Sequence, residues 1–148
     1  MKRTIQKGFT LIELLIVIAV LGVLSAGVVV AINPVKRMNS ANDAKVKNDV
    51  GQIATAAQAY FTDRQCYPSG GQADLVTAGD LTVALSAPST YADYTVVASP
   101  GSCSCTATVK TCTGIAIGGQ IKAPVTAGNT KWCWTSTSGT AVEGTTCP

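Results

Sequence analysis

Hydrophobic residues follow three different patterns along this chain. Residues 14–32 contain no charged side chain and would form a helix of roughly 28 Å, about the thickness of the hydrocarbon core of a bilayer. From about residue 35 to residue 64, apolar residues recur at steps of three and four, as on one face of an amphipathic helix. Beyond that point, short β-rich stretches alternate with glycine, proline and asparagine. The pattern predicts two nearly continuous helices followed by a small head.

The two helical segments are separated by Asn33-Pro34, where we expect a kink or a short break because proline removes a backbone donor. The second segment should pack on the head through an apolar face consisting of Val46, Val50, Ile53, Ala57, Tyr60 and Phe61. Asp49 falls elsewhere on the helical wheel, with Lys45, Asn48, Gln52 and Thr55.

The region after Cys66 predicts an antiparallel sheet packed on the second helix. Strands are expected at residues 94–99, 105–111, 114–121 and 131–137. A short helix is expected within residues 80–88, with Asp80 as its N-cap. Short strands that follow a long helix predict an α+β fold, in which a long N-terminal helical spine carries a small antiparallel head.

The charge of the chain is concentrated at one end. The net charge is +3, and Lys2, Arg3 and Lys7 lie in an acid-free stretch at the N-terminus, so the remainder is formally neutral. A basic tip before a long apolar run indicates membrane topology, with the tip in the cytoplasm and the head outside. Nucleic-acid-binding domains instead keep their positive charge in the folded part, so no specific nucleic-acid partner is predicted.

Glu13 is a charged residue at the start of the apolar run, directly before Leu14. Placing a carboxylate in hydrocarbon costs roughly several kcal/mol, and such residues are functional by default.

Catalytic patterns are missing from the sequence, since it has no histidine, no nucleophile motif and no close acid pair in the head. The sequence therefore predicts a structural protein without a cofactor or metal, and not an enzyme.

The cysteines are confined to the predicted head. They are Cys66, Cys103, Cys105, Cys112, Cys133 and Cys147. Because there is no histidine and no CxxC pair, disulfides are favoured over a zinc site, and six cysteines allow about 15 pairings. Pairing of Cys103 or Cys105 with Cys112 is sterically possible across a hairpin.

The two tryptophans of "WCW" at 132–134 should share one face of a strand, as core residues or as an exposed adhesive patch.

At "KGFTLIELLIVIAVLGVL" the chain resembles the type IV pilins and the pseudopilins of type II secretion. The resemblance rests on a short basic leader that ends at Gly8, on Phe9 directly after it, and on Glu13 as the fifth residue counted from Phe9. It implies cleavage after Gly8 by a membrane prepilin peptidase, methylation of the new amine of Phe9, and assembly into a helical filament. The implied segments are a leader (1–8), a hydrophobic helix (9–33), an amphipathic helix (34–65) and a head (66–148).

The resemblance also gives Glu13 and the last two cysteines an expected role. Glu13 of one subunit would pair with the Phe9 amine of its neighbour, which is a strong interaction in a dry core. Cys133 and Cys147 would form the C-terminal disulfide loop of many pilins.

The chain departs from the major pseudopilins in one respect, because they bind calcium in an acidic C-terminal loop. Glu143 is the only acid after Asp93 here, so calcium is not expected.

Three functions remain open at this stage. The first is a pilus subunit for adhesion, motility or DNA uptake, which begins in the inner membrane and ends in an extracellular filament. The second is a major pseudopilin of a periplasmic secretion filament. The third is a membrane-tethered, disulfide-rich binding module that never polymerises. The first two imply identical subunits, the prepilin peptidase, the assembly machinery of the inner membrane and, before assembly, membrane lipid as partners.

Overall fold

The computed structural model describes residues 8–147 and divides the chain into two compact units that meet between Arg37 and Met38. The first unit contains α1, Leu11–Ile32. The stretch Leu11–Val29 within it is long and apolar enough to cross a membrane. None of that stretch is buried within residues 8–147.

The break expected between the two helices is present at Asn33. This residue adopts the left-handed conformation, with φ of 46°, directly after α1. Its side-chain Oδ1 accepts a hydrogen bond from the backbone N–H of Lys36 at 3.2 Å, so it also caps the helix that follows. Pro34 occupies the first position of that helix, where its missing N–H costs nothing.

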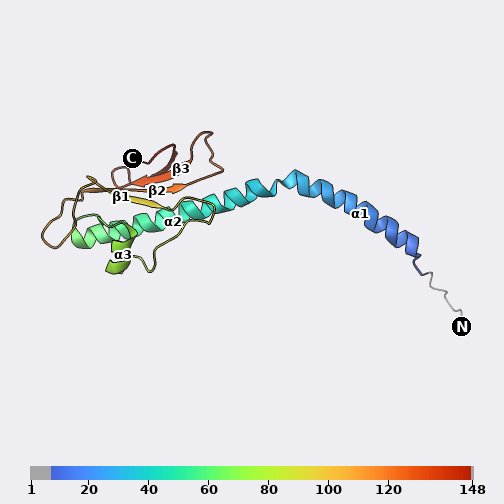
Figure 1. The fold of residues 1–148 in the computed structure, drawn as a ribbon, viewed down its shortest axis with the longest axis horizontal. Coiled ribbons are helices and arrows are strands. Elements are labelled where there is room, and N and C mark those ends of the chain that lie inside the picture. Colours follow the sequence, from blue (N-terminus) through green and yellow to red (C-terminus); the bar gives the residue numbers. More distant parts are fainter. Residues whose placement is uncertain (1–7, 148) are drawn as a thin grey trace. The chain divides into compact units, whose positions relative to one another are not determined.

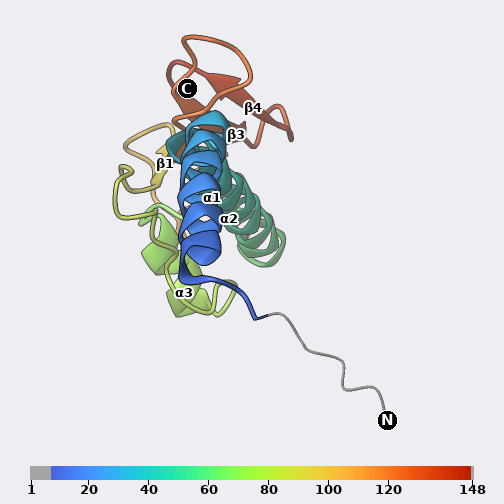
Figure 2. The same cartoon turned by 90° about the vertical axis from the view of Figure 1, so that its right-hand side faces the viewer.

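The second unit is an α+β head, which confirms the predicted fold class. It contains most of α2 (Pro34–Arg64), the short α3 (Gln72–Ala78) and a four-stranded sheet. The strands are β1 (Thr95–Ser99), β2 (Gly114–Gln120), β3 (Lys131–Thr135) and β4 (Ala141–Gly144). All neighbours are antiparallel in the order β1-β2-β3-β4. The sheet lies along one side of α2, and α3 lies on another (Figures 1 and 2).

The core lies between α2 and the sheet. Val46, Val50 and Ile53 of α2 are fully buried, as the apolar periodicity predicts, and so is Ile117 of β2. Gly119 of β2 is what allows the helix and the sheet to approach, because a Cβ at this position would meet Val46 and the ring of Tyr94. A glycine in a strand commonly marks such a close approach.

Gly119→Ala is therefore expected to destabilise the head by about 1–3 kcal/mol through overpacking. The measurement is urea denaturation of residues 34–148, which we expect to fold alone because the core and all the cysteines lie within them. Gly51→Ala is the matched control: it adds the same methyl group in open space on α2 and should stabilise by about 1 kcal/mol. Equal stability of the two variants would contradict this packing.

One predicted helix is in the wrong place. Residues 80–88 form no helix, and the short helix is α3, which precedes them. Gly79 ends α3 in the left-handed conformation, with φ of 87°, and the N–H of Asp80 turns back to the carbonyl of Leu75 at 3.0 Å. Asp80 is thus past the end of a helix and does not cap one, and its carboxylate lies 3.6 Å from Arg64 Nη1.

The strand predictions are partly correct. Strands are present within 94–99, 114–121 and 131–137, but 105–111 contains only an isolated bridge between Cys105 and Lys110. This segment is held by disulfides instead of a ladder. The four-residue strand β4 was not predicted, because Ala141–Gly144 is too short to show an alternating pattern.

Asp49 differs from the sequence-based view, and the two tryptophans decide between its alternatives. Asp49 is buried, at 5% exposure, although it lies off the predicted apolar face, because its Oδ2 accepts hydrogen bonds from the hydroxyl of Tyr94 and from Lys45. Of the two tryptophans, Trp134 is buried in the core, and the ring of Trp132 is covered by Lys47 Nζ at 4.4 Å from its centroid. An exposed aromatic patch for adhesion is therefore not formed by this pair.

Candidate processing and assembly site

The predicted cleavage point lies just before the first helix. Gly8, Phe9 and Thr10 are non-helical, and α1 begins at Leu11. Phe9 is 84% exposed. The basic residues of the predicted leader, Lys2, Arg3 and Lys7, lie outside the described residues. The peptide bond between Gly8 and Phe9 thus lies outside the helical hydrogen bonding of α1.

Glu13 and Thr10 form a capping box at the start of α1. Glu13 Oε2 accepts hydrogen bonds from the Thr10 backbone N–H at 2.9 Å and from the Thr10 hydroxyl at 2.7 Å. The Thr10 hydroxyl in turn accepts the backbone N–H of Glu13 at 3.3 Å. This arrangement stabilises the first turn and gives the carboxylate polar partners within its own chain. The capping box was not predicted, although the spacing Thr-x-x-Glu is its known signature.

The surface of α1 is apolar and uncovered. Its large side chains are exposed from Leu11 through Val29, with Leu11 at 77% and Leu24 at 62%. None of the stretch Leu11–Val29 is buried in the part of the chain that the structure describes. Such a surface is stable in lipid or against other apolar helices, and not in water.

All six cysteines are in disulfides. The pairs are Cys66–Cys105, Cys103–Cys112 and Cys133–Cys147. The first fastens the segment after β1 to the residues that follow α2, and the second closes that same segment on itself, where a ladder is missing. The third joins β3 to the C-terminus and lies over Gly118, at which an added Cβ would meet Cys147 Sγ and Thr95 Oγ1. The disulfides fix the irregular parts of a head whose core is small.

Asp43 is a buried carboxylate that sequence analysis did not single out. Its Oδ1 accepts the hydroxyl of Tyr91 at 2.7 Å and the backbone N–H of Lys122 at 2.9 Å, and its Oδ2 accepts the N–H of Ala123 at 2.7 Å. Burial, followed by this hydrogen bond to Asp43, raises the pKa of Tyr91 above its usual range. Asp43 thereby fastens two loops of the head to α2.

Glu143 fastens the loop before β3 in a similar way. Its carboxylate accepts the backbone N–H groups of Val125 at 3.0 Å and Thr126 at 3.1 Å, and it pairs with Lys47 Nζ at 3.1 Å. The two backbone hydrogen bonds, more than the lysine, hold the pKa of Glu143 below its usual value of 4.5. Both oxygens therefore have protein donors.

Because the pKa of Glu143 is lowered by folding, its contribution to stability is present above the unfolded value of 4.5 and is lost as the pH falls through the folded value. Between about pH 7 and pH 3 the unfolding midpoint of the wild type should fall more steeply than that of Glu143→Gln. Urea denaturation across this range measures the difference. Parallel pH profiles would contradict the role of this carboxylate.

Within residues 8–147, no group of three or more Cys, Asp or Glu side chains is placed to hold a metal ion. The chemical resources of the described chain are therefore an uncovered apolar helix, a capped carboxylate near its start, and a cross-linked head.

One family model and three known proteins match parts of this chain. Residues 3–29 match the prokaryotic N-terminal methylation motif. The chain is 36% identical over 123 residues to the fimbrial protein EcpC of Eikenella corrodens, covering 82% of this chain and 74% of that protein. It is 40% and 35% identical over 72 residues to the type II secretion system core protein G of Pseudomonas aeruginosa and of Klebsiella michiganensis. These two alignments cover 49% of this chain and about half of each relative. No solved structure gives a significant match.

Proposed function

This chain belongs to the family of type IV pilins and type II secretion pseudopilins, and we propose on that premise that it is a structural subunit of a type IV pilus. Members of this family are structural subunits and not enzymes. The observation that carries the choice of pilus is the extent of the fimbrial match, which covers 82% of the chain and so includes much of the head. The matches to the secretion proteins cover 49%.

In the proposed assembly, a prepilin peptidase cleaves after Gly8 and the new amine of Phe9 is methylated. The apolar helix α1 holds the subunit in the inner membrane with its head outside, and then leaves lipid for a filament of identical subunits. Glu13 of one subunit pairs with the positive amine of the next. This pairing is strong in a water-free filament core and sets the register, since a subunit out of step would bury an unpaired charge.

A pseudopilin of type II secretion is the second candidate, because two core protein G sequences match at 40% and 35% identity. This second candidate has less support, because a major pseudopilin is expected to have an acidic calcium-binding loop. Glu143 is the acid in the corresponding C-terminal region here, and both of its carboxylate oxygens already accept hydrogen bonds from protein donors.

Imaging of cell-surface filaments with an antibody to the head separates these candidates. Long extracellular fibres that contain this chain are expected for a pilin. Labelling confined to the periplasm, with secretion lost on deletion, would favour the pseudopilin and contradict the first proposal. Mass analysis of the mature N-terminus separates both from a tethered binding module, which would keep residues 1–8 and would not polymerise.

A further inference from the structure

Two of the three disulfides interleave along the chain. Cys66 pairs with Cys105, and Cys103, which lies between them, pairs with Cys112 beyond them. The remaining disulfide joins the last two cysteines, which are consecutive. Joining consecutive cysteines throughout would instead give Cys66–Cys103 and Cys105–Cys112. The native head therefore requires a choice between two sets of pairs that use the same four cysteines.

Chain entropy does not favour the native set. The native pairs are 39 and 9 residues apart, and each of the consecutive pairs is two residues closer. The entropy of closing a loop grows slowly with its length, so the non-native set is slightly easier to close. In the proposed topology the head crosses the membrane in sequence order, and Cys66 meets Cys103 before Cys112 is available. Oxidation that precedes folding therefore gives non-native pairs at least as readily as native ones.

The hairpin between Cys103 and Cys112 sets one of the native pairs. Its register is fixed by a hydrogen bond from the backbone N–H of Thr111 to the carbonyl of Ser104 at 3.0 Å, which places Cys103 opposite Cys112. The ladder of this hairpin is reduced to one isolated bridge. A two-stranded hairpin of this size is marginally stable by itself in water. It therefore depends on the rest of the head to keep its register.

One member of each interleaved pair lies in the core. Cys66 is 0% exposed and Cys112 is 1% exposed, whereas Cys103 and Cys105 are half-buried. The backbone N–H of Tyr67 donates to the carbonyl of Cys112 at 2.9 Å, which holds the two buried cysteines close in the fold. These contacts select the native pairs only after the core has formed. Wrong pairs that form in the unfolded chain must then be exchanged.

A chain with wrong pairs has no thiol of its own with which to correct them. All six cysteines of the sequence are in disulfides, and none is free. Thiol–disulfide exchange begins when a thiolate attacks a disulfide sulfur. A fully oxidised copy of this chain contains no thiolate, so the attacking group must come from another molecule.

We propose that the head is a substrate of a disulfide isomerase, a protein whose reduced and reactive cysteine exchanges disulfides in the compartment that receives the head. The inference rests on the proposed placement of the head outside the cytoplasm, where disulfides form and persist. The partner is defined by its chemistry: it supplies a thiolate and recovers it when the exchange is complete.

The exchange consumes no oxidant. The isomerase thiolate attacks Sγ of Cys103 in a Cys66–Cys103 pair, forms a mixed disulfide and releases the Cys66 thiolate. The Cys66 thiolate attacks Sγ of Cys105 in the Cys105–Cys112 pair and releases the Cys112 thiolate, which attacks Cys103 and frees the isomerase. Each step forms one S–S bond and breaks one, so there is no net gain or loss of electrons.

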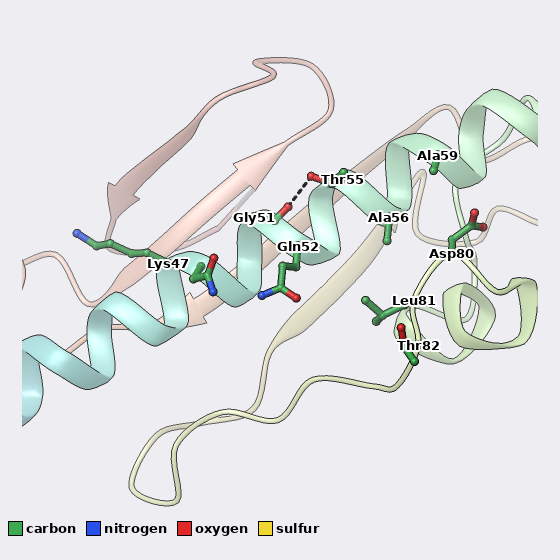
Figure 3. Close-up of a pocket in the computed structure, with 10 residues that line it drawn as sticks. Lys47, Gly51, Gln52, Thr55, Ala56, Ala59, Asp80, Leu81 and Thr82 are labelled. Carbon is green, nitrogen blue, oxygen red and sulfur yellow. Dashed lines mark hydrogen bonds between the residues drawn. The ribbon is translucent and has the colours of Figure 1, made fainter.

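Cys105 is a point at which an external thiolate can reach the folded head. It lines a cavity of about 340 Å³ together with Tyr60 and Arg64 at the end of α2. The larger groove, of about 660 Å³, lies between α2 and residues 80–82, and none of the ten residues that line it is a cysteine (Figure 3). The isomerase is therefore expected to contact the cavity at Cys105 and not the groove.

Removing the envelope isomerase of a bacterial host tests the inference. The full chain is produced in a host that keeps its thiol oxidant, with and without the isomerase. Free thiols are then blocked, and the disulfides are mapped by mass spectrometry of unreduced peptides. Without the isomerase, we expect the fraction of chains with the native pairs to fall roughly fivefold or more. The other chains should contain Cys66–Cys103 or Cys105–Cys112.

Two double variants are the matched controls. Cys103→Ala with Cys112→Ala leaves Cys66 and Cys105 as consecutive cysteines, and Cys66→Ala with Cys105→Ala leaves Cys103 and Cys112 consecutive. Neither variant has interleaved pairs, so the remaining pairs should form equally in the two hosts. The peptide map reads these pairs directly, whether or not the variant folds stably.

Equal native pairing of the wild type in the two hosts would overturn the inference and leave the pilus proposal intact. Dependence on the isomerase that persists in either double variant would also overturn it, because interleaving would not be the cause. Six reduced cysteines in both hosts would instead contradict the proposed placement of the head outside the cytoplasm, and the inference with it. The failure of the inference alone is thus distinguishable from the failure of the proposed function.

Discussion

Replacing Glu13 with alanine is expected to reduce filament assembly on the order of 100-fold or more. The variant removes one partner of the proposed ion pair and leaves the Phe9 amine of the neighbouring subunit buried without a counterion. Breaking a buried pair in this way costs about 3–5 kcal/mol, which exceeds the 2.8 kcal/mol or so that corresponds to a hundredfold change in an association constant. Quantitative immunoblotting of sheared surface filaments against total subunit measures the effect.

Glu13→Gln separates the charge from the helix cap. Glutamine can still accept the hydrogen bonds of Thr10 that the carboxylate accepts at 2.7 and 2.9 Å, so the capping box is retained and only the charge is lost. We expect this variant to assemble as poorly as Glu13→Ala. Wild-type assembly from Glu13→Gln would show that the cap is sufficient, and it would contradict the pairing with the Phe9 amine.

Replacing Asp43 with alanine is expected to destabilise the head by about 3 kcal/mol. Without the carboxylate, the Tyr91 hydroxyl and the backbone N–H groups of Lys122 and Ala123 lose the acceptor they share. The Tyr91 hydroxyl keeps the carbonyl of Asn39 as an acceptor at 3.2 Å, whereas the two N–H groups are left without an acceptor and retain their full desolvation penalty. Urea denaturation of residues 34–148 measures the loss.

Asp63→Ala is the matched control for this variant. Asp63 lies on the same helix but is exposed, and its replacement should change the stability by less than about 0.5 kcal/mol. Equal stability of the Asp43 and Asp63 variants would show that the buried hydrogen bonds of Asp43 do not hold the head together.

The elements that the sequence predicts well are those with a long period. The apolar run of α1 and the repeated apolar face of α2 each extend over many residues, so the boundaries at Leu11–Ile32 and Pro34–Arg64 follow closely from the pattern. The errors lie where tertiary contacts or single residues decide. Gly79 places the end of α3 before Asp80, and disulfides replace the ladder that the β-rich composition of residues 105–111 predicts.

The acidic residues of α2 show why the site was only partly predictable. A division into apolar and polar positions places Asp49 off the apolar face, whereas hydrogen bonds from the hydroxyl of Tyr94 and the ammonium of Lys45 hold its carboxylate in a buried position. Asp43 is engaged by residues about 80 positions further along the chain, and no local pattern reveals such a contact. The motif around Gly8, Phe9 and Glu13 is local, and for this reason it can be recognised from the sequence alone.

The most direct test of polymerisation through a processed N-terminal helix is mass analysis of this chain in purified surface filaments. The account predicts filaments whose subunits begin at an N-methylated Phe9. A chain recovered only as an unassembled membrane protein that still carries Met1 to Gly8 would contradict it.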